Sequence, residues 1–284
     1  MEKEDNITYI KGTYIWSFNK NFQNKIKMIK SINGNIKLQN MNIFKDNEEF
    51  ILKPRCIIND PFDEDNSILI SCDIIDLENT CNNYDERKTF LKEIQHFGKE
   101  IKKNDSKISF SQKFKINTSN IDLQTIANNL IKNCLSSNIE IDEIEIENDI
   151  INVCNKFTNA LSACDELYFI RYIFMEISKK FKFEYKLFNN LSYKFLDDKT
   201  SNSDGIEFIN KYIKNLEDKN DIIKKNEIFE MYHNEFKVGN NPSDNIFIPK
   251  STFLAKCGYF VDNRFIADTD PYSIIYSNLN QIYS

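Results

Sequence analysis

The sequence is poor in several residues and patterns that mark whole classes of protein. Its 284 residues include only six glycines and five prolines, so flexible linkers and low-complexity disorder are not expected. No apolar run is long enough to span a membrane, and residues 1–5 are mainly charged, unlike the apolar core of a signal peptide. These absences predict a cytoplasmic protein without a membrane-spanning segment.

Common catalytic and metal-binding patterns are also missing. The seven cysteines are odd in number and include no Cys-x-x-Cys pair, which favours scattered, buried, reduced thiols over a disulfide framework or a zinc site. Only His96 and His233 are present, and neither lies in a Ser-His-Asp or Cys-His signature. No glycine-rich phosphate loop occurs. None of these reaction classes is therefore indicated by a local motif.

The remaining composition is that of a folded, acidic protein. Hydrophobic residues make up 41% and aromatic residues 13% of the chain, and the abundance of Asn, Ile and Lys is what an AT-rich genome produces. The net charge of −6 and the pI near 5.2 argue against binding of nucleic acid over a large surface, although lysine clusters allow local contacts with phosphate. These clusters are Lys99, Lys102 and Lys103; Lys179, Lys180 and Lys182; and Lys224 and Lys225.

Strand-like and helix-like patterns alternate along the chain. Residues 13–18 and 68–70 predict strands, and 139–147, where isoleucines alternate with acidic residues, predicts a half-buried strand with a solvated face. Apolar residues recur at helical spacing in other segments. Those segments are 90–97, 121–131, 167–177 and 206–216. The alternation predicts an α+β or α/β fold.

Two helix starts are predicted from capping residues. Asp204 precedes the apolar stripe of 206–216, and Asp270 with Pro271 has the composition of a cap followed by a first helical turn. Lys179, Lys180 and Lys182 lie near the end of the 167–177 stripe, where cations complement the helix dipole.

Several segments, in the same order, resemble the glutamine synthetase family. Residues 258–264 (Gly-Tyr-Phe-Val-Asp-Asn-Arg) and then 270–273 (Asp-Pro-Tyr-Ser) are similar to its Gly-Tyr-Phe-Glu-Asp-x-Arg followed by Asp-Pro-Phe-Ser. Further similar segments are 59–62 and 67–73 (an Asp-Pro-Phe turn and an apolar strand), 82–87 (Thr-Asn-x-Arg in the family), 205–216 (a helix) and 248–250 (Ile-Pro-Arg in the family). The resemblance covers residues 12–284.

This resemblance implies a fold and a chemistry. It implies an α+β protein with a small β-grasp-like domain at 1–85 and a catalytic-type domain at 86–284. Glutamine synthetases hold two divalent cations in a ring of carboxylates and a His, because ATP and the glutamyl-phosphate intermediate carry charge that must be neutralised.

The residues that should bind those cations differ in this chain. Val261 stands where the family has Glu, and Lys102 replaces the second acid of a Glu-x-Glu whose first acid is Glu100. In the next carboxylate strand Glu147, or Glu145 with another placement of the gap, matches the first acid, and Asn152 replaces the second.

The nucleotide and ammonia elements differ as well. Ser192, Lys194 and Leu196 stand where the family has His-x-Asn-x-Ser, and no Asp-Gly-Ser-Ser element occurs between Ile32 and Phe50. Arg264 keeps the family's arginine, or serves in an ion pair with Asp262 or Asp268. The resemblance thus implies a pseudoenzyme with no catalytic, cofactor-binding or metal-binding residues.

A retained fold without catalysis favours a binding role. The preferred hypothesis is a factor bound to a large cytosolic assembly of protein or ribonucleoprotein, with the ribosome as the boldest choice: a dormancy or hibernation factor whose lysine clusters contact rRNA. Three alternatives stay open. They are a sensor of nucleotide or amino acid, a ring-forming structural homo-oligomer, and a residual glutamate–ammonia ligase.

Overall fold

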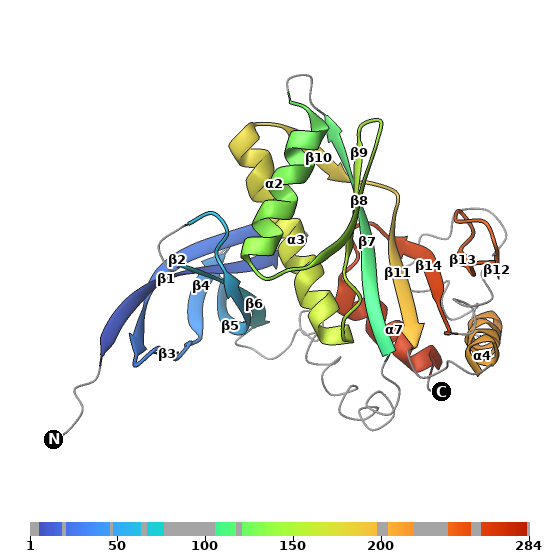
Figure 1. Cartoon of the computed structure of the whole chain (residues 1–284). Coiled ribbons are helices and arrows are strands. Elements are labelled where there is room, and N and C mark those ends of the chain that lie inside the picture. The colour runs from blue at the N-terminus through green and yellow to red at the C-terminus, as the bar shows by residue number, and fades with distance from the viewer. Residues whose placement is uncertain are drawn as a thin grey trace. The chain divides into compact units, whose positions relative to one another are not determined.

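The computed structural model describes residues 6–18, 21–45, 48–63, 67–76, 106–117, 121–197, 204–218, 238–250 and 257–282. The fold is mixed α and β, and β-sheet is the larger part (Figure 1). The chain divides into two compact units: residues 1–87 with 131–139, and residues 88–130 with 140–284. The boundary predicted between residues 85 and 86 lies outside the described residues and stays a prediction.

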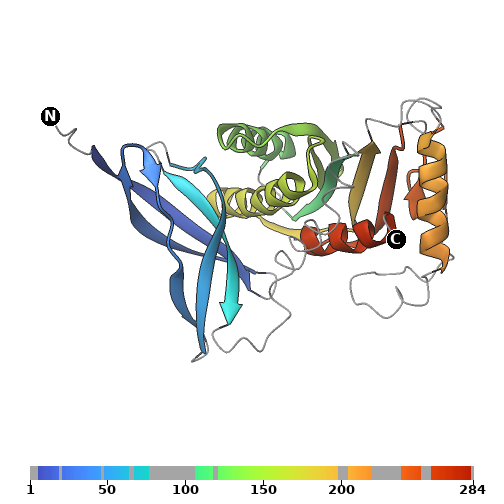
Figure 2. The same ribbon diagram turned by 90° about the horizontal axis from the view of Figure 1, so that it is seen from below.

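The first unit is built on a six-stranded sheet of order β3-β2-β1-β6-β5-β4. Strands β1 and β6 are parallel at its centre, and the other neighbouring strands are antiparallel. Figure 2 shows these strands, blue to cyan, as twisted ribbons. Their bounds are β1 Ile7–Phe18, β2 Asn21–Ile32, β3 Asn35–Ile36, β4 Met41–Lys45, β5 Glu48–Asn59 and β6 Ile68–Asp76.

One face of this sheet carries the first core. Alternate residues of β1 point to the same side, so Tyr14 and Trp16 are buried together with Ile29 and Ile70. Gly12 lies in this row, and a Cβ there would be 2.3 Å from Cδ1 of Ile29. The glycine therefore lets Ile29 pack across β1.

The second unit is built on an eight-stranded sheet. Its main path has the order β12-β13-β14-β11-β7-β9-β8, and β10 pairs with the end of β7. The strands are β7 Ser106–Asn117, β8 Ile141–Glu147, β9 Ile150–Asn155, β10 Glu184–Leu187, β11 Asn190–Asp197, β12 Val238–Gly239, β13 Ile246–Phe247 and β14 Phe260–Ile266. The helices are α2 Leu123–Ser136, α3 Ala160–Phe181, α4 Asp204–Asp218 and α7 Pro271–Ile282.

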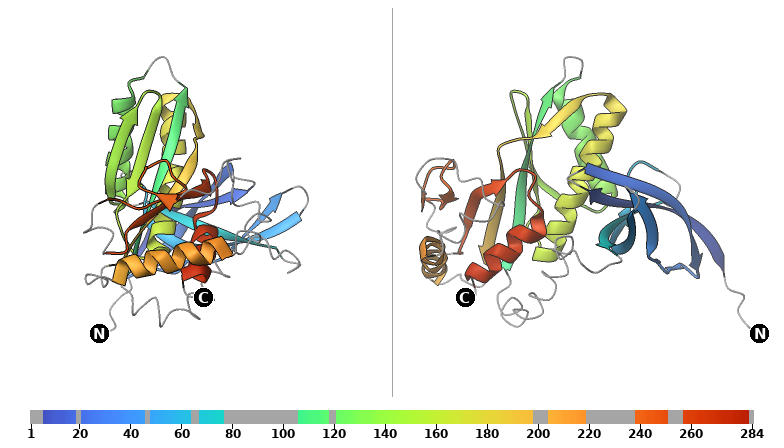
Figure 3. Two further views of the ribbon diagram at one scale, coloured as in Figure 1. Left: turned by 90° about the vertical axis from the view of Figure 1, so that its right-hand side faces the viewer. Right: turned by 180° about the vertical axis from the view of Figure 1, so that it is seen from behind.

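Helices α3 and α7 pack on one face of this sheet (Figure 3, right). The ring of Phe114 in β7 stacks on Phe174 in α3 with their centroids 3.9 Å apart. Arg171 of α3 crosses from the helix to the sheet, where its Nε and Nη2 donate to Oε1 of Gln112 at 2.9 and 2.7 Å. The same guanidinium donates to the carbonyls of Ala267 and Thr269 and so fixes the turn that precedes α7.

The described elements confirm most of the predicted strands and helices. The predicted strands at 13–18 and 68–70 lie within β1 and β6, and the one at 139–147 overlaps β8, which begins later, at Ile141. The stripes at 167–177 and 206–216 lie within α3 and α4, which begins at Asp204, and the stripe at 121–131 overlaps α2, which begins later, at Leu123. Asp270 caps α7 as predicted, since its Oδ1 accepts from the backbone N–H of Tyr272 at 2.9 Å. The predicted stripe at 90–97 lies outside the described residues.

The cysteines and helices agree with the absences in the sequence. Of the six cysteines within the described residues, four are buried: Cys72, Cys134, Cys154 and Cys164. Burial raises the pKa of Cys72 to about 12. In the part of the chain that is described, every helix is too short or too polar to cross a bilayer.

Candidate functional site: a polar face of the second sheet

The second sheet has a polar face opposite α3. Phe114 and Gln112 of β7 both contact α3, so their side chains point to the same face of the strand. Ser111 is the neighbour of Gln112 in the strand. Ser111 therefore points to the other side. The strand register places Cys154 and Ser192 directly beside Ser111 on that side. We call this side the polar face; its residues are Ser109, Ser111, Glu143, Glu145, Asn152, Cys154, Ser192, Lys194 and Val261.

Lys194 is the main charge on the polar face. Its side chain is 18% exposed, and its ammonium lies 3.1 Å from Sγ of Cys154 and 4.0 Å from Oε2 of Glu143. Burial alone would lower the pKa of Lys194, but Cys154, and more weakly Tyr259 and Glu143, outweigh burial and raise it. The side chain therefore carries a positive charge at neutral pH.

Asn152 joins three strands of the same face. Its Oδ1 accepts from the hydroxyl of Ser111 at 2.6 Å, and its Nδ2 donates to Oε2 of Glu145 at 3.0 Å. Glu147 is instead opposite Ile150 at the end of the hairpin and is exposed. Glu145 and Glu147 were the alternative matches to the first acid of the family's strand, and Glu145 is the one that contacts Asn152.

Strand β14 completes the face. Val261 is directly opposite Lys194 and is 7% exposed. Ser192 donates from its hydroxyl to Oδ1 of Asn263 at 2.7 Å, and Nδ2 of Asn263 donates to the carbonyl of Asp244 at 2.9 Å. Tyr259, just before β14, has a raised pKa, mainly because of burial and in spite of the nearby Lys194.

The chemistry of the polar face is that of a surface for polar groups. It carries the ammonium of Lys194, the exposed carboxylates of Glu143 and Glu145, hydroxyls and an amide. Among the residues described, no group of three or more His, Cys, Asp and Glu side chains is arranged to hold a metal ion. A cation that approached Lys194 would meet the like charge of its ammonium.

Arg264 lies on the opposite, helix-covered face. Its Nη2 and Nε donate to the two carboxylate oxygens of Asp262 at 2.6 and 2.8 Å, which confirms the predicted ion pair with Asp262. The hydroxyl of Tyr212 in α4 lies 3.0 Å from Oδ2 of the same carboxylate. Burial lowers the pKa of Arg264, but Asp262 outweighs it and raises the pKa overall. The cluster ties α4 to the sheet.

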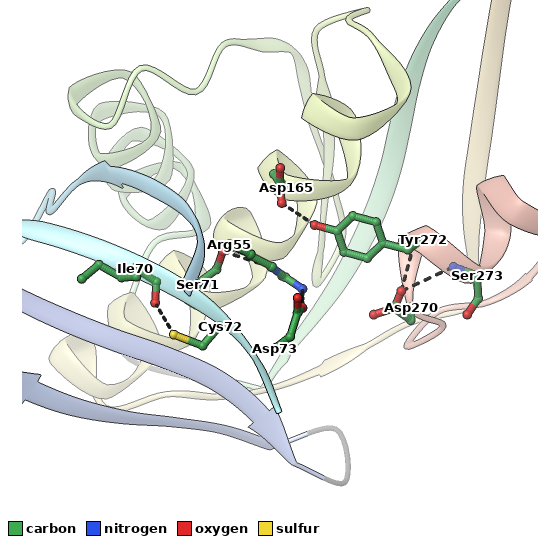
Figure 4. A network of polar contacts seen from close by, with 9 residues as sticks. All are labelled: Arg55, Ile70, Ser71, Cys72, Asp73, Asp165, Asp270, Tyr272 and Ser273. Carbon is green, nitrogen blue, oxygen red and sulfur yellow. Dashed lines mark hydrogen bonds and ion pairs between the residues drawn. The ribbon is translucent and has the colours of Figure 1, made fainter. Parts of the chain in front are cut away.

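Figure 4 shows two other groups of polar contacts, one in each unit. In the first unit, Nε of Arg55 donates to Oγ of Ser71 at 3.0 Å, and its Nη1 is 3.3 Å from Oδ1 of Asp73. In the second unit, the hydroxyl of Tyr272 in α7 donates to the carboxylate of Asp165 in α3. Both groups hold neighbouring elements together.

Glu166 is an acid whose environment disfavours its charge. Burial raises its pKa to about 7, although Nδ2 of Asn155 donates to its Oε2 at 2.8 Å and opposes the rise. Because Asn155 also accepts from the backbone N–H of Phe110 at 2.8 Å, Glu166 belongs to the packing of α3 on the sheet.

Several residues weighed in the sequence lie outside the described residues. These are Glu100, Lys102, His96, His233, residues 82–87, and the lysine clusters at 99–103 and 224–225. The sequence reasoning missed Ser109, Ser111 and Cys154 as members of the polar face. The alternation of Ser109 and Ser111 with Ile108 and Phe110 was the signal that could have found them.

No model of a known protein family matches this sequence, and no curated protein matches it at the required significance. The arrangement of the polar face must therefore be interpreted from its own residues.

Proposed function

We propose that the protein is a catalytically inactive, glutamine synthetase-like binding factor that acts on a large cytosolic assembly. The observation that carries the proposal is the position of Lys194. Its ammonium is fixed at the centre of the polar face by Cys154 and Glu143. A divalent cation 4 Å from this ammonium would be repelled by roughly 8 kcal/mol at an effective dielectric constant of about 20.

The geometry supports the resemblance behind this proposal. The resemblance assigned Asn152, Ser192, Lys194 and Val261 to the metal and nucleotide site, although they come from three strands far apart in sequence. All four lie on the polar face. Segments matched by chance would have no reason to share one face of one sheet. The parallel pair β1 and β6 in a small separate sheet is compatible with the proposed β-grasp-like first unit.

The replaced residues also support the loss of catalysis. Synthetase chemistry needs several oxygen and imidazole ligands together, because hard cations must neutralise ATP and the acyl phosphate. On the polar face those places hold an amide, a hydroxyl, an ammonium and an isopropyl group. An isopropyl group has no lone pair to donate to a cation.

A sedimentation experiment tests the binding role. The ribosome is the proposed assembly, and lysates of growing and of dormant cells would be separated on sucrose gradients and probed for the protein. We expect it in the ribosomal fractions of dormant cells and expect it to shift when ribosomes are dissociated by chelation of magnesium. Recovery only at the top of the gradient in both states would refute the ribosomal assignment.

An assay for γ-glutamyl hydroxamate tests the inactive state separately. We expect no product above background with magnesium or manganese, ATP, glutamate and hydroxylamine. A turnover that depends on the metal and scales with the amount of protein would contradict the proposal.

A further inference from the structure

One segment of the chain carries lysines and no acidic residue. Residues 6–45 contain seven lysines and neither Asp nor Glu, whereas the whole chain has a net charge of −6. Most of this segment forms β1, β2 and β3, which are neighbours at one side of the first sheet, and its last residues form β4 at the opposite edge. A strongly basic surface on an acidic protein points to an anionic partner at that place.

The lysines of β2 are exposed and free of carboxylates. Lys25, Lys27 and Lys30 are all exposed, and none of the three forms an ion pair with a described residue. Strand β3 pairs only with Ser31 and Ile32 at the end of β2. Along the rest of β2, β1 is the one described strand that pairs with it. The lysines of β2 therefore lie on an edge of the sheet.

The face of the β1–β2 hairpin that points away from the first core is apolar as well as basic. Tyr9 is directly opposite Lys30, and Met28 is directly opposite Lys11. Tyr9 is 65% exposed, Met28 57% and Ile26 58%. Directly opposite residues on one face have their Cβ atoms about 5 Å apart, so an aromatic ring, aliphatic groups and an ammonium form one continuous surface.

We propose that this β1–β2 surface, formed by Tyr9, Lys25, Ile26, Lys27, Met28 and Lys30, binds single-stranded RNA. Phosphates contact the lysines along β2, and a base stacks on the ring of Tyr9 with Met28 and Ile26 beside it. Basic residues next to exposed aromatic rings on a sheet are the means by which proteins hold single strands without reading their sequence.

The same residues suit two further roles less well. Lysines on an edge strand also prevent association of sheets, but that role needs no exposed Tyr9 and Met28 beside them. An acidic protein would be attracted by the lysines too. However, Lys25 and Lys27 point to the face opposite Lys30. The positive charges therefore lie on both faces of the edge strand. This arrangement suits a flexible polyanionic strand better than a flat protein surface.

The inference deepens the proposed binding role and rests on it only in that the protein has a partner. It concerns the first unit and would stand if the polar face had another use. Binding of purified RNA tests the β1–β2 surface, while sedimentation with ribosomes tests the assembly, so a failure of one is distinguishable from a failure of the other.

Fluorescence anisotropy with the purified full chain and a labelled 20-nucleotide oligouridylate tests the proposal. We expect saturable binding that weakens with salt, with a slope of log K against log salt of about −2 if three phosphates are neutralised. The triple variant Lys25→Glu/Lys27→Glu/Lys30→Glu should weaken binding at least tenfold. The control Lys186→Glu/Lys211→Glu/Lys214→Glu makes the same change of net charge with exposed lysines of the second unit and should stay within about twofold.

The role of Tyr9 gives a second readout. Tyr9→Ala should weaken binding about fivefold or more, and Tyr9→Phe should keep it, because the ring and not the hydroxyl stacks on a base. Equal affinity for an RNA duplex of the same length, or equal displacement of the RNA by a polyglutamate peptide, would overturn the assignment to single strands.

Photo-crosslinking keeps the proposal testable if a variant fails to fold. Oligouridylate that contains 4-thiouridine would be crosslinked to the unaltered protein, and the modified peptides would be mapped by mass spectrometry. We expect crosslinks within residues 6–32. Crosslinks confined to the second unit, or equal losses of affinity in the two triple variants, would refute the proposal.

Discussion

The two sheets of this protein use their lysines in opposite ways. In the second sheet, Lys194 is mostly buried and is held by Cys154 and Glu143, so its charge is fixed in place and unsuited to a neighbouring cation. In the first sheet, Lys25, Lys27 and Lys30 are exposed and make no ion pair with described residues. The comparison teaches that the surroundings of a lysine, rather than its presence, decide whether it contributes to the fold or to a partner.

The same comparison separates charges that the fold needs from charges that it does not. The ion pair of Asp262 and Arg264 in the second unit is buried, and loss of one partner should destabilise the protein. Exposed charges of the first unit should affect binding alone. Substitutions in both units test this distinction.

The largest effect is expected at the buried ion pair on the helix-covered face. Asp262→Ala leaves the guanidinium of Arg264 without its carboxylate and removes one of the two acceptors of the Tyr212 hydroxyl, the other being Oδ1 of Asn278, which should cost about 3–5 kcal/mol of unfolding free energy. Urea unfolding followed by circular dichroism measures it. A loss below about 1 kcal/mol would show that the pair is not needed by the fold.

A smaller, pH-dependent effect is expected at Glu166. Its pKa in the folded protein is about 7, above its ordinary value of 4.5, so the folded state binds the proton more tightly and stability falls as the pH rises from about 4.5 to about 7. Glu166→Gln, which cannot ionise, should stabilise the protein by on the order of 1–3 kcal/mol at pH 8 and by little at pH 4.5.

Urea unfolding at the two pH values checks this expectation. The exposed Glu147→Gln of β8 is the matched control and should show no such gain. An equal gain for Glu166→Gln at both pH values would mean that the charge of Glu166 is not the cause.

An effect of about 1 kcal/mol is expected at the cap of α7. Asp270→Ala removes the acceptor for the backbone N–H of Tyr272 and should lower the unfolding free energy by that amount, while Asp270→Asn should keep most of it. Thermal unfolding of the two variants decides the matter, because equal stability of the Ala and Asn variants would exclude capping.

The smallest effect on stability is expected on the β1–β2 surface. Lys25→Gln should change the unfolding free energy by less than about 0.5 kcal/mol, since the ammonium is exposed and has no described carboxylate beside it. A loss comparable to that of Asp262→Ala would remove the distinction between the two units.

Much of the secondary structure could be predicted from the sequence because its periodicity is strong. Isoleucines alternate in β8, apolar residues recur every three or four positions in α3, and Asp270 with Pro271 marks the start of α7. For Arg264 the sequence allowed an ion pair with Asp262 or with Asp268, and the structure pairs it with Asp262.

The candidate site was harder to predict because register is a tertiary property. The sequence left Glu145 and Glu147 as alternatives, although the two-residue turn Asn148-Asp149, with Asn148 at φ 54°, sets Glu145 opposite Asn152. Cys154 was read only as a buried thiol, because its contact with Lys194 spans 40 residues. The β1–β2 surface could not be recognised from clusters of lysines in the sequence, because the pairing of β1 with β2 is what brings Tyr9 beside Lys30.

A calorimetric titration of the full chain with manganese, alone and with ATP, tests most directly whether the polar face has lost a metal site. If Lys194 and Val261 have replaced a metal site on the polar face, no binding heat will be seen for the natural protein. The variant Asn152→Glu/Ser192→His/Lys194→Asn/Val261→Glu should gain manganese binding, since it places three metal-ligating side chains on one face and removes the ammonium. Two manganese ions bound by the natural protein, abolished by substitutions on the polar face, would contradict the account.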